Sequence, residues 1–137
     1  MKILVSACLL GENCKYSGGN NYNQAVCDFA RGHQVVPVCP EVLGGLPTPR
    51  CPAEIVQGVV TNKEGINVDR EFRAGAAKAL AIAKENGVEL AILQSRRPSC
   101  GVKEIYDGTF SGTKIPGPGV FAKMLMVEGI RVLDGGA

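Results

Sequence analysis

The sequence is poor in aromatic residues and nearly balanced in charge. It has no Trp, three Tyr and four Phe, too few to build the stacked aromatic platform of a single-strand nucleic-acid binder. Its 15 Lys and Arg residues against 13 Asp and Glu residues give a formal net charge of +2, whereas polynucleotide-binding domains are strongly basic. We therefore expect the protein to act on small molecules and to form no stable complex with a polynucleotide.

Long apolar runs and a secretory signal are missing as well. No segment approaches the roughly 18 consecutive apolar residues that a membrane span needs. The chain begins MKILVSACLLG and continues with Glu-Asn, without the small-residue cleavage site of a signal peptide. We expect a cytoplasmic protein with no membrane contact, either a monomer or a homodimer.

The length and apolar content are those of a chain that needs no disulfides to fold. Of its 137 residues 45% are hydrophobic, so a single domain over residues 1–137 can bury a core of its own. Disulfide frameworks are typical of short secreted chains with little apolar content. The six cysteines are therefore expected to be reduced or bound to metal.

Apolar runs alternate with helical segments along the chain. Asp69 is predicted at the N-cap of the longest helix and Gly87 just beyond its C-terminus. Nearly continuous apolar strands between helices predict an α/β class, with a single-domain three-layer Rossmann-like fold and a mainly parallel sheet. Two loops rich in Pro and Gly, residues 43–54 and 108–119, are long enough to be functional. The pattern predicts strands over residues 3–5, 35–38, 54–60, 88–94 and 130–134, and helices over residues 23–32, 69–87 and 119–129.

Three cysteines stand where predicted strands end. Cys8 follows the first strand, Cys39 ends the second, and Cys100 follows the strand of residues 88–94. In an open parallel sheet, ligands bind beyond the carboxyl ends of the strands, and neighbouring strands lie only ~5 Å apart. We therefore predict that these three thiols converge on one small site.

The other cysteines and the single His receive different interpretations. Cys27 lies in a predicted helix and is expected to be a small buried hydrophobe. Cys51, in a loop, is expected to have a structural or incidental role. Cys14 lies in a polar, glycine-rich loop that could fold over the same site, so both interpretations stay open for it. His33, at the amino end of the second strand, is expected to be structural.

Three dispersed thiolates suit an iron–sulfur cluster. Structural zinc takes four ligands and usually includes a close cysteine pair, which the trio lacks. A 4Fe-4S cluster on three thiolates leaves one iron open to a soft sulfur or nitrogen donor. Glu41, two residues after Cys39, is the first candidate for a general acid or base. Ser99, beside Cys100, is expected either to hydrogen-bond the substrate or a cluster sulfur, or to serve in a turn.

Positive charge is available in the loops at the same strand ends. Arg50, Arg96 and Arg97 lie there, and Lys15 follows Cys14. The segment GPGVFAKML opens a helix whose free backbone N–H groups suit an anion. Together these features are compatible with a mononucleotide as the ligand.

Motifs at these positions resemble the thiouracil desulfidase family. The resemblance runs from residue 1 to about residue 133, and ordered motifs of this length are highly specific for the family. The motifs are SACLLG with Cys8, the following Cys14 and Tyr16, PVCPEVLGGLPTPR from Pro37 to Arg50, PAEI from Pro52, PSCG from Pro98, IYDGTFSGT from Ile105, and GPGVFAKML.

The resemblance implies an oxygen-sensitive 4Fe-4S cluster on Cys8, Cys39 and Cys100 in a Rossmann-like fold. It implies removal of sulfur from a thiolated pyrimidine, such as 2-thiouracil or 4-thiouridine monophosphate. In the implied mechanism the thione sulfur binds the open iron, and water attacks the ring carbon, which gives the oxo-pyrimidine and sulfide by hydrolysis. Glu41 transfers the proton, and a serine near Cys100 shares the acid–base role.

Two positions differ from the pattern of the family. Ser17 stands where an aspartate is usual, and Arg97 stands where a serine usually precedes the proline. If that serine is the catalytic one, Ser95 or Ser99 must replace it in this chain. The additional arginine favours stronger binding of a phosphorylated substrate.

Two other classes of function fit the same residues. A cysteine persulfide sulfur carrier or redox sensor without iron would use a reactive thiol of low pKa at Cys8, Cys14 or Cys100. A nucleotide-binding module would keep its ligand affinity after Cys-to-Ser substitution. The iron content of protein purified without oxygen separates the desulfidase from both.

Overall fold

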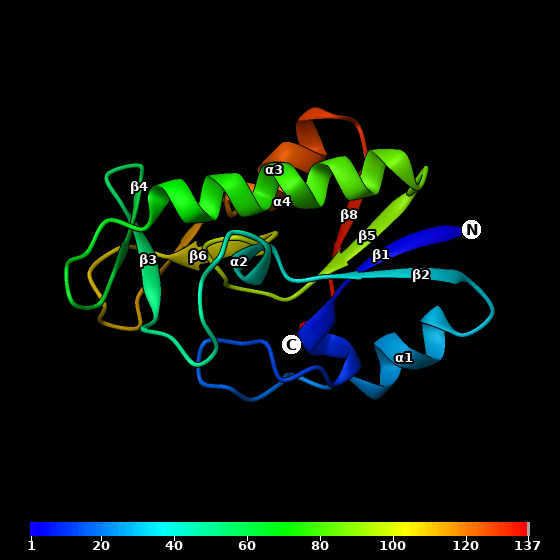
Figure 1. Ribbon diagram of the computed structural model, residues 1–137, viewed down its shortest axis with the longest axis horizontal. Helices are drawn as coiled ribbons and strands as arrows, with labels where there is room; N and C mark the ends of the chain where they lie inside the picture. Colours follow the sequence, from blue (N-terminus) through cyan, green and yellow to red (C-terminus); the bar gives the residue numbers. More distant parts are fainter. Residues whose placement is uncertain (137) are drawn as a thin grey trace.

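Four parallel strands form the central sheet of the computed structural model, which describes residues 1–136 (Figure 1). All three strand pairings are parallel, as the continuously apolar strands predict. The strand order reverses beside β1, because β2 lies on one side of it and β5 on the other, and ligands bind at such reversals. In their order across the sheet the strands are β2 (Gln34–Val38), β1 (Lys2–Ser6), β5 (Leu90–Leu93) and β8 (Arg131–Asp134).

Helices cover both faces of this sheet. Figure 1 shows α3 and α4 on one side of the strands and α1 on the other. Within residues 1–136 no helix has the length and apolar character to cross a membrane. The helices are α1 (Gln24–Ala30), α2 (Pro40–Leu43), α3 (Asp69–Glu85) and α4 (Val120–Val127), and a 3-10 helix, η1 (Ala7–Leu10), follows β1.

Strand β1 shows why the fold has three layers. Its central residues Ile3, Leu4 and Val5 are fully buried, and successive side chains of a strand point to opposite faces. Ile3 and Val5 pack in a core cluster with residues of α1, whereas Leu4 belongs to the larger cluster with α3 and α4. The predicted three-layer α/β class is therefore confirmed.

The strand predicted over residues 54–60 is instead a β-hairpin. Strands β3 (Ala53–Val56) and β4 (Val59–Asn62) pair antiparallel. Gln57 and Gly58 join them with φ values of 49° and 81°, and two positive φ values in succession are typical of a type I′ turn. The prediction was wrong because Gln-Gly is a weaker turn signal than Asn-Gly or Asp-Gly.

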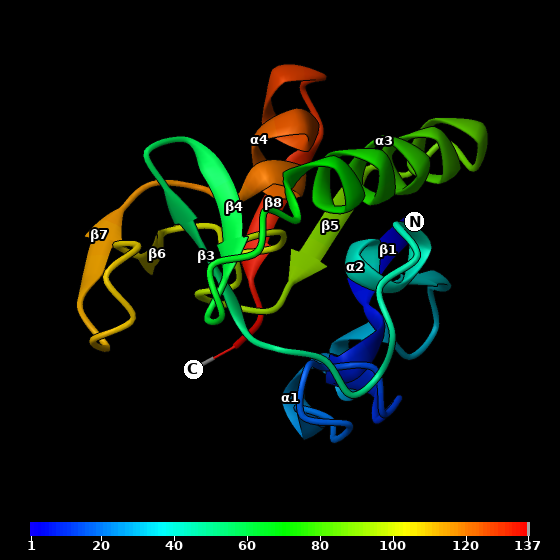
Figure 2. The ribbon, with the colours of Figure 1, turned by 60° about the vertical axis from the view of Figure 1, so that its left-hand side comes forward.

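A second hairpin occupies one of the two long loops. Strands β6 (Glu104–Tyr106) and β7 (Lys114–Pro116) pair antiparallel, and Figure 2 shows this hairpin beside the first one, away from the parallel sheet. The carboxylate of Glu54 joins the two hairpins, because it accepts hydrogen bonds from the backbone N–H groups of Gly108 and Phe110. The hairpins thus form a wall next to the carboxyl ends of the sheet strands.

Helix α3 begins differently from the prediction and ends as predicted. Val68 occupies the N-cap, and Asp69 is the first helical residue. The Asp69 carboxylate accepts a hydrogen bond from the Val60 N–H at 3.0 Å and pairs with Arg73 at 3.1 Å, so it ties the helix to β4. At the other end Gly87 lies just beyond the C-cap with a φ of 63°, where glycine is favoured.

Two glycines allow α2 to lie directly on the backbone of α3. A Cβ atom on Gly75 would collide with the carbonyl oxygen of Pro40, and one on Gly44 would collide with the carbonyl oxygen of Glu71. This four-residue helix was not predicted, because four residues are too few to show helical periodicity. Its contact with α3 fixes the segment that follows β2.

Candidate active site

Four cysteine thiols line one cavity at the carboxyl end of the parallel sheet. Cys8 lies in η1 after β1, Cys39 directly follows β2, and Cys100 lies in the loop after β5. The structure therefore brings together the three thiols that the strand ends predict to converge. Cys14, for which the sequence left two interpretations open, lines the same inner cavity from the loop after η1.

Hydrogen bonds among the thiols favour the thiolate form of two of them. The Cys14 thiol hydrogen-bonds to Cys39 and Cys8, which raises the pKa of Cys14. The same contacts lower the pKa of Cys39 to about 6 and that of Cys8 to about 7. Burial raises the pKa of Cys100 to about 12. Thiolates are the form that binds metals.

The loop that carries Ser99 and Cys100 is held by the N-terminus of α4. The Val120 N–H donates to the carbonyl oxygen of Pro98 at 2.7 Å, and three further N–H groups of this helix start bind carbonyls of the same loop. The predicted anion site at this helix is therefore wrong, because the chain itself supplies the acceptors. Gly119 allows this contact, since a Cβ there would lie 2.6 Å from the Pro98 oxygen.

Glu41 is held by an arginine on one side and a serine on the other. Its Oε1 accepts from Arg50 Nε at 3.1 Å and lies 3.0 Å from Arg50 Nη2. Its Oε2 accepts from the Ser99 hydroxyl at 2.7 Å. Glu41 is only 6% exposed, and the Arg50 side chain is equally buried. Arg50, proposed from sequence as a phosphate ligand, is therefore engaged in fixing this carboxylate.

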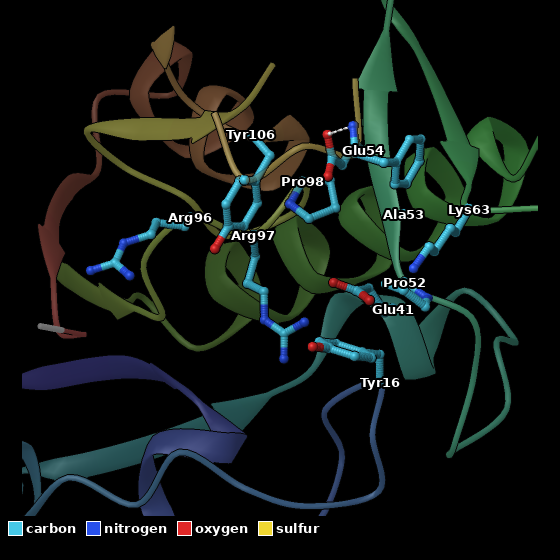
Figure 3. Close-up of a pocket in the computed structure, with 12 residues that line it drawn as sticks. Tyr16, Glu41, Pro52, Ala53, Glu54, Lys63, Arg96, Arg97, Pro98 and Tyr106 are labelled. Carbon is cyan, nitrogen blue, oxygen red and sulfur yellow. Dashed lines mark hydrogen bonds between the residues drawn. The ribbon is translucent and has the colours of Figure 1, made fainter. Parts of the chain in front are cut away.

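Figure 3 shows the residues that line a second, outer pocket. Its volume is about 250 Å³. Glu41 and Arg97 line both spaces, so the two meet at these side chains. Cationic and aromatic side chains and residues of both hairpins line this pocket. They include Tyr16, Glu54, Lys63, Arg96, Arg97, Tyr106 and Phe110.

Several other candidates lie away from both spaces. Cys27 is on α1, where its Sγ lies 3.9 Å from the Leu9 carbonyl oxygen, and Cys51 and Ser95 line neither space. Of the two serines proposed near Cys100, Ser99 lines the inner cavity and Ser95 does not. His33, just before β2, packs near the ring of Phe29 at the opposite end of the sheet.

Sequence reasoning missed the residues that shape the outer pocket. Tyr16 comes from the Cys14 loop, Lys63 follows β4, and Tyr106 ends β6. No local pattern links these segments, which meet only through the hairpins. Tyr16 and Tyr106 nevertheless lie in motifs on which the family resemblance rests.

The donor set of the inner cavity fits an iron–sulfur cluster. Thiolates are the soft ligands that such clusters use, and Cys8, Cys39 and Cys100 would hold the group from three different segments of the chain. Within residues 1–136 no three His, Cys, Asp or Glu side chains converge closely enough to hold a single metal ion. The free volume of this cavity is about 20 Å³.

Comparisons with known proteins agree over nearly the whole chain. The family model described as 2-thiouracil desulfurase matches residues 3–135. The uncharacterized protein YbbK of Bacillus subtilis (strain 168) is 42% identical over 142 residues, covering 96% of this chain and 94% of YbbK. A solved structure of the 4Fe-4S-dependent thiouracil desulfidase TudS is 40% identical with a TM-score of 0.89, covering 97% of this chain and 89% of that one. This chain therefore belongs to the 2-thiouracil desulfurase family.

Proposed function

We propose that the protein removes the sulfur of a thiolated pyrimidine, thiouracil or 4-thiouridine monophosphate, by hydrolysis to the oxo-pyrimidine and sulfide. The observation that carries this proposal is the placement of Glu41, whose carboxylate lies where the thiol cavity meets the outer pocket. The family membership and the named activity of TudS support the same reaction. We place the reaction in the cytoplasm, where thiols stay reduced.

The cofactor in this proposal is a 4Fe-4S cluster held by Cys8, Cys39 and Cys100. An iron without a protein ligand supplies a Lewis-acid position for the thione sulfur. The cofactor named for the similar TudS structure supports this assignment. Cys14 lines the same cavity, but we leave it outside the ligand set, because the family resemblance implies Cys8, Cys39 and Cys100 as the ligands.

Glu41 is the base in the reaction we propose. Water that attacks the thiocarbonyl carbon must lose a proton, and a buried carboxylate beside the reacting atom can accept it. Arg50 and Ser99 hold the two carboxylate oxygens at 3.0 and 2.7 Å, so the Glu41 carboxylate does not have to reorient before it accepts the proton. The Ser99 hydroxyl donates to Glu41 and thereby fixes which lone pairs face the substrate.

The outer pocket would receive the remainder of the substrate. A volume of about 250 Å³ lies near the lower limit for small-molecule sites. Lys63 and Arg96 line this pocket without lining the inner cavity, and Arg96 lies 3.8 Å from Glu104 in a half-exposed pair. These two cations are our candidates to bind the phosphate of a nucleotide substrate.

The first test measures iron, acid-labile sulfide and turnover on anaerobically reconstituted protein. We expect about four irons per chain in the wild type, and loss of iron in Cys8→Ser, Cys39→Ser and Cys100→Ser. Cys27→Ser is the matched control, since its thiol lies on α1 outside the site, and it should keep both iron and activity. Reaction in water labelled with heavy oxygen should place that label in the oxo-pyrimidine.

Other outcomes point to other functions. Protein without iron that accumulates a persulfide on Cys8 or Cys14 would support the sulfur-carrier interpretation in place of ours. An iron content that is unchanged in all three Cys-to-Ser variants would exclude Cys8, Cys39 and Cys100 as the cluster ligands. Sulfide release without incorporation of labelled oxygen would exclude hydrolysis and retain only the removal of sulfur.

A further inference from the structure

Arg97 occupies the junction between the two spaces of the site. Together with Glu41 it lines both the thiol cavity and the outer pocket. Figure 3 shows the Arg97 side chain reaching from the loop after β5 towards Tyr16 and the space beside Glu41. A substrate that extends from one space into the other must pass this guanidinium.

The guanidinium is held flat without using its hydrogen-bond donors. The central carbon of Arg97 lies 5.0 Å from the centroid of the Tyr16 ring, within the range of a cation–π contact. Among the side-chain hydrogen bonds and ion pairs of residues 1–136, none engages Arg97, whereas Arg50 and Arg96 both face carboxylates. A planar group with five N–H donors is therefore oriented at the junction and free to bind a ligand.

We propose that Arg97, supported by Tyr16, is the specificity-determining residue that binds the base of the thiolated pyrimidine. This inference rests on the proposed function and names a contact within it. When the thiocarbonyl group points into the thiol cavity, the ring lies at the junction. The ring then presents its remaining carbonyl oxygen to Arg97, and this oxygen has two lone pairs that can accept N–H groups of the guanidinium.

The placement of the other cations separates the base from the phosphate. Lys63 and Arg96 line only the outer pocket, where the sugar and phosphate of a nucleotide would lie. Among the cations of the described residues that line the thiol cavity, Arg50 pairs with Glu41 and Lys15 donates to Asn21 Oδ1, whereas Arg97 has no side-chain hydrogen bond or ion pair. A contact to the base predicts that a nucleobase and its nucleotide depend equally on Arg97. A contact to phosphate predicts that only the nucleotide does.

The test compares the affinities of uracil and uridine monophosphate, the oxo forms of the proposed substrates, by anaerobic calorimetry on reconstituted protein. Arg97→Met should weaken both ligands by the same factor, about tenfold or more, because a charge-assisted hydrogen bond to the ring is lost. Lys63→Met is the matched control and should weaken only the nucleotide. Arg97→Lys keeps the charge but loses the planar group that stacks on Tyr16, so it should recover little of the uracil affinity.

A loss confined to uridine monophosphate in Arg97→Met would overturn the proposal, since it would make Arg97 a phosphate ligand. Unchanged affinity for both ligands would overturn it as well. If Arg97→Met fails to load iron, Tyr16→Leu decides, because removing the aromatic support should weaken both ligands by a similar factor. Wild-type protein that binds uracil through Arg97 but releases no sulfide from thiouracil would count against the proposed function and leave this contact in place.

Discussion

Glu41 is a buried acid whose two oxygens have different partners. Arg50 pairs with one oxygen and the Ser99 hydroxyl donates to the other. Replacing it by Gln keeps the shape of the side chain and removes the base. We expect Glu41→Gln to lower kcat by about 10²- to 10⁴-fold, with the visible spectrum of the cluster unchanged. Steady-state release of sulfide, measured beside the spectrum, checks both expectations.

The control for this substitution is Glu104→Gln, which removes a half-exposed carboxylate 3.8 Å from Arg96. It should leave kcat near the wild-type value. Because Glu41→Gln leaves the buried Arg50 without its counter-charge, a loss of stability is also expected, so kcat is measured well below the melting temperature. Full activity in Glu41→Gln would remove this residue from the mechanism.

At the scale of residues, the sequence predicts those that follow sheet strands and misses those that meet through loops. Cys8, Cys39 and Cys100 could be predicted because parallel strands end at a common edge. The pairing of Glu41 with Arg50 could not, because it depends on how the loop after α2 folds back. The stack of Arg97 on Tyr16 joins segments about 80 residues apart, and neither has a pattern that identifies the other.

At the scale of elements, the contact between α2 and α3 positions the residues that follow β2. Gly75 has no space for a side chain, because a Cβ there would collide with the carbonyl oxygen of Pro40. An Ala at an exposed helix site is about 1 kcal/mol more favourable than Gly. Here we expect the opposite sign, a loss of about 1–3 kcal/mol from overpacking, and a lower iron content because α2 must shift together with Glu41.

Thermal unfolding and iron analysis of Gly75→Ala measure the two effects. Ala74→Ser, which adds one heavy atom on the exposed face of the same helix, is the control and should change neither quantity appreciably. A stabilised Gly75→Ala protein with full iron content would show that α2 can move without consequence for the site.

The elements themselves divide into those with a clear period and those without. The sheet strands and α3 were predicted because their apolar patterns are continuous or helical over many residues. The β3–β4 hairpin was missed because its turn, Gln57 and Gly58, lacks the usual Asn or Asp. The sequence indicates an anion site at the start of α4, whereas in the structure its N–H groups bind the carbonyls around Ser99. The free N–H groups of a helix N-terminus can bind many kinds of acceptor, and the sequence does not show whether a ligand or the chain itself supplies it.

At the scale of the whole molecule, the fold could be predicted more completely than the pocket. Alternating strands and helices require a layered α/β arrangement, and the structure has it. The outer pocket lies between the sheet and two hairpins whose pairing is antiparallel. Its walls depend on the contact between Glu54 and the backbone of the second hairpin, a contact across more than 50 residues that no periodicity indicates.

The last prediction concerns what the cluster does for the stability of the molecule. Core clusters fill both faces of the sheet without any contribution from a cofactor, so the cluster-free protein should stay folded. A cluster bound to thiolates after β1, β2 and β5 would tie three strand ends together and stabilise the folded state by linkage. We expect the melting temperature to fall by about 5–15 °C when the cluster is removed under reducing conditions, with the far-ultraviolet circular dichroism retained. Cys39→Ser should have the same melting temperature with and without added iron. Cys27→Ser should show the same difference in melting temperature between loaded and cluster-free protein as the wild type. Equal melting temperatures for loaded and cluster-free wild type would mean that iron is bound elsewhere, because a ligand that joins three strand ends must favour the folded chain.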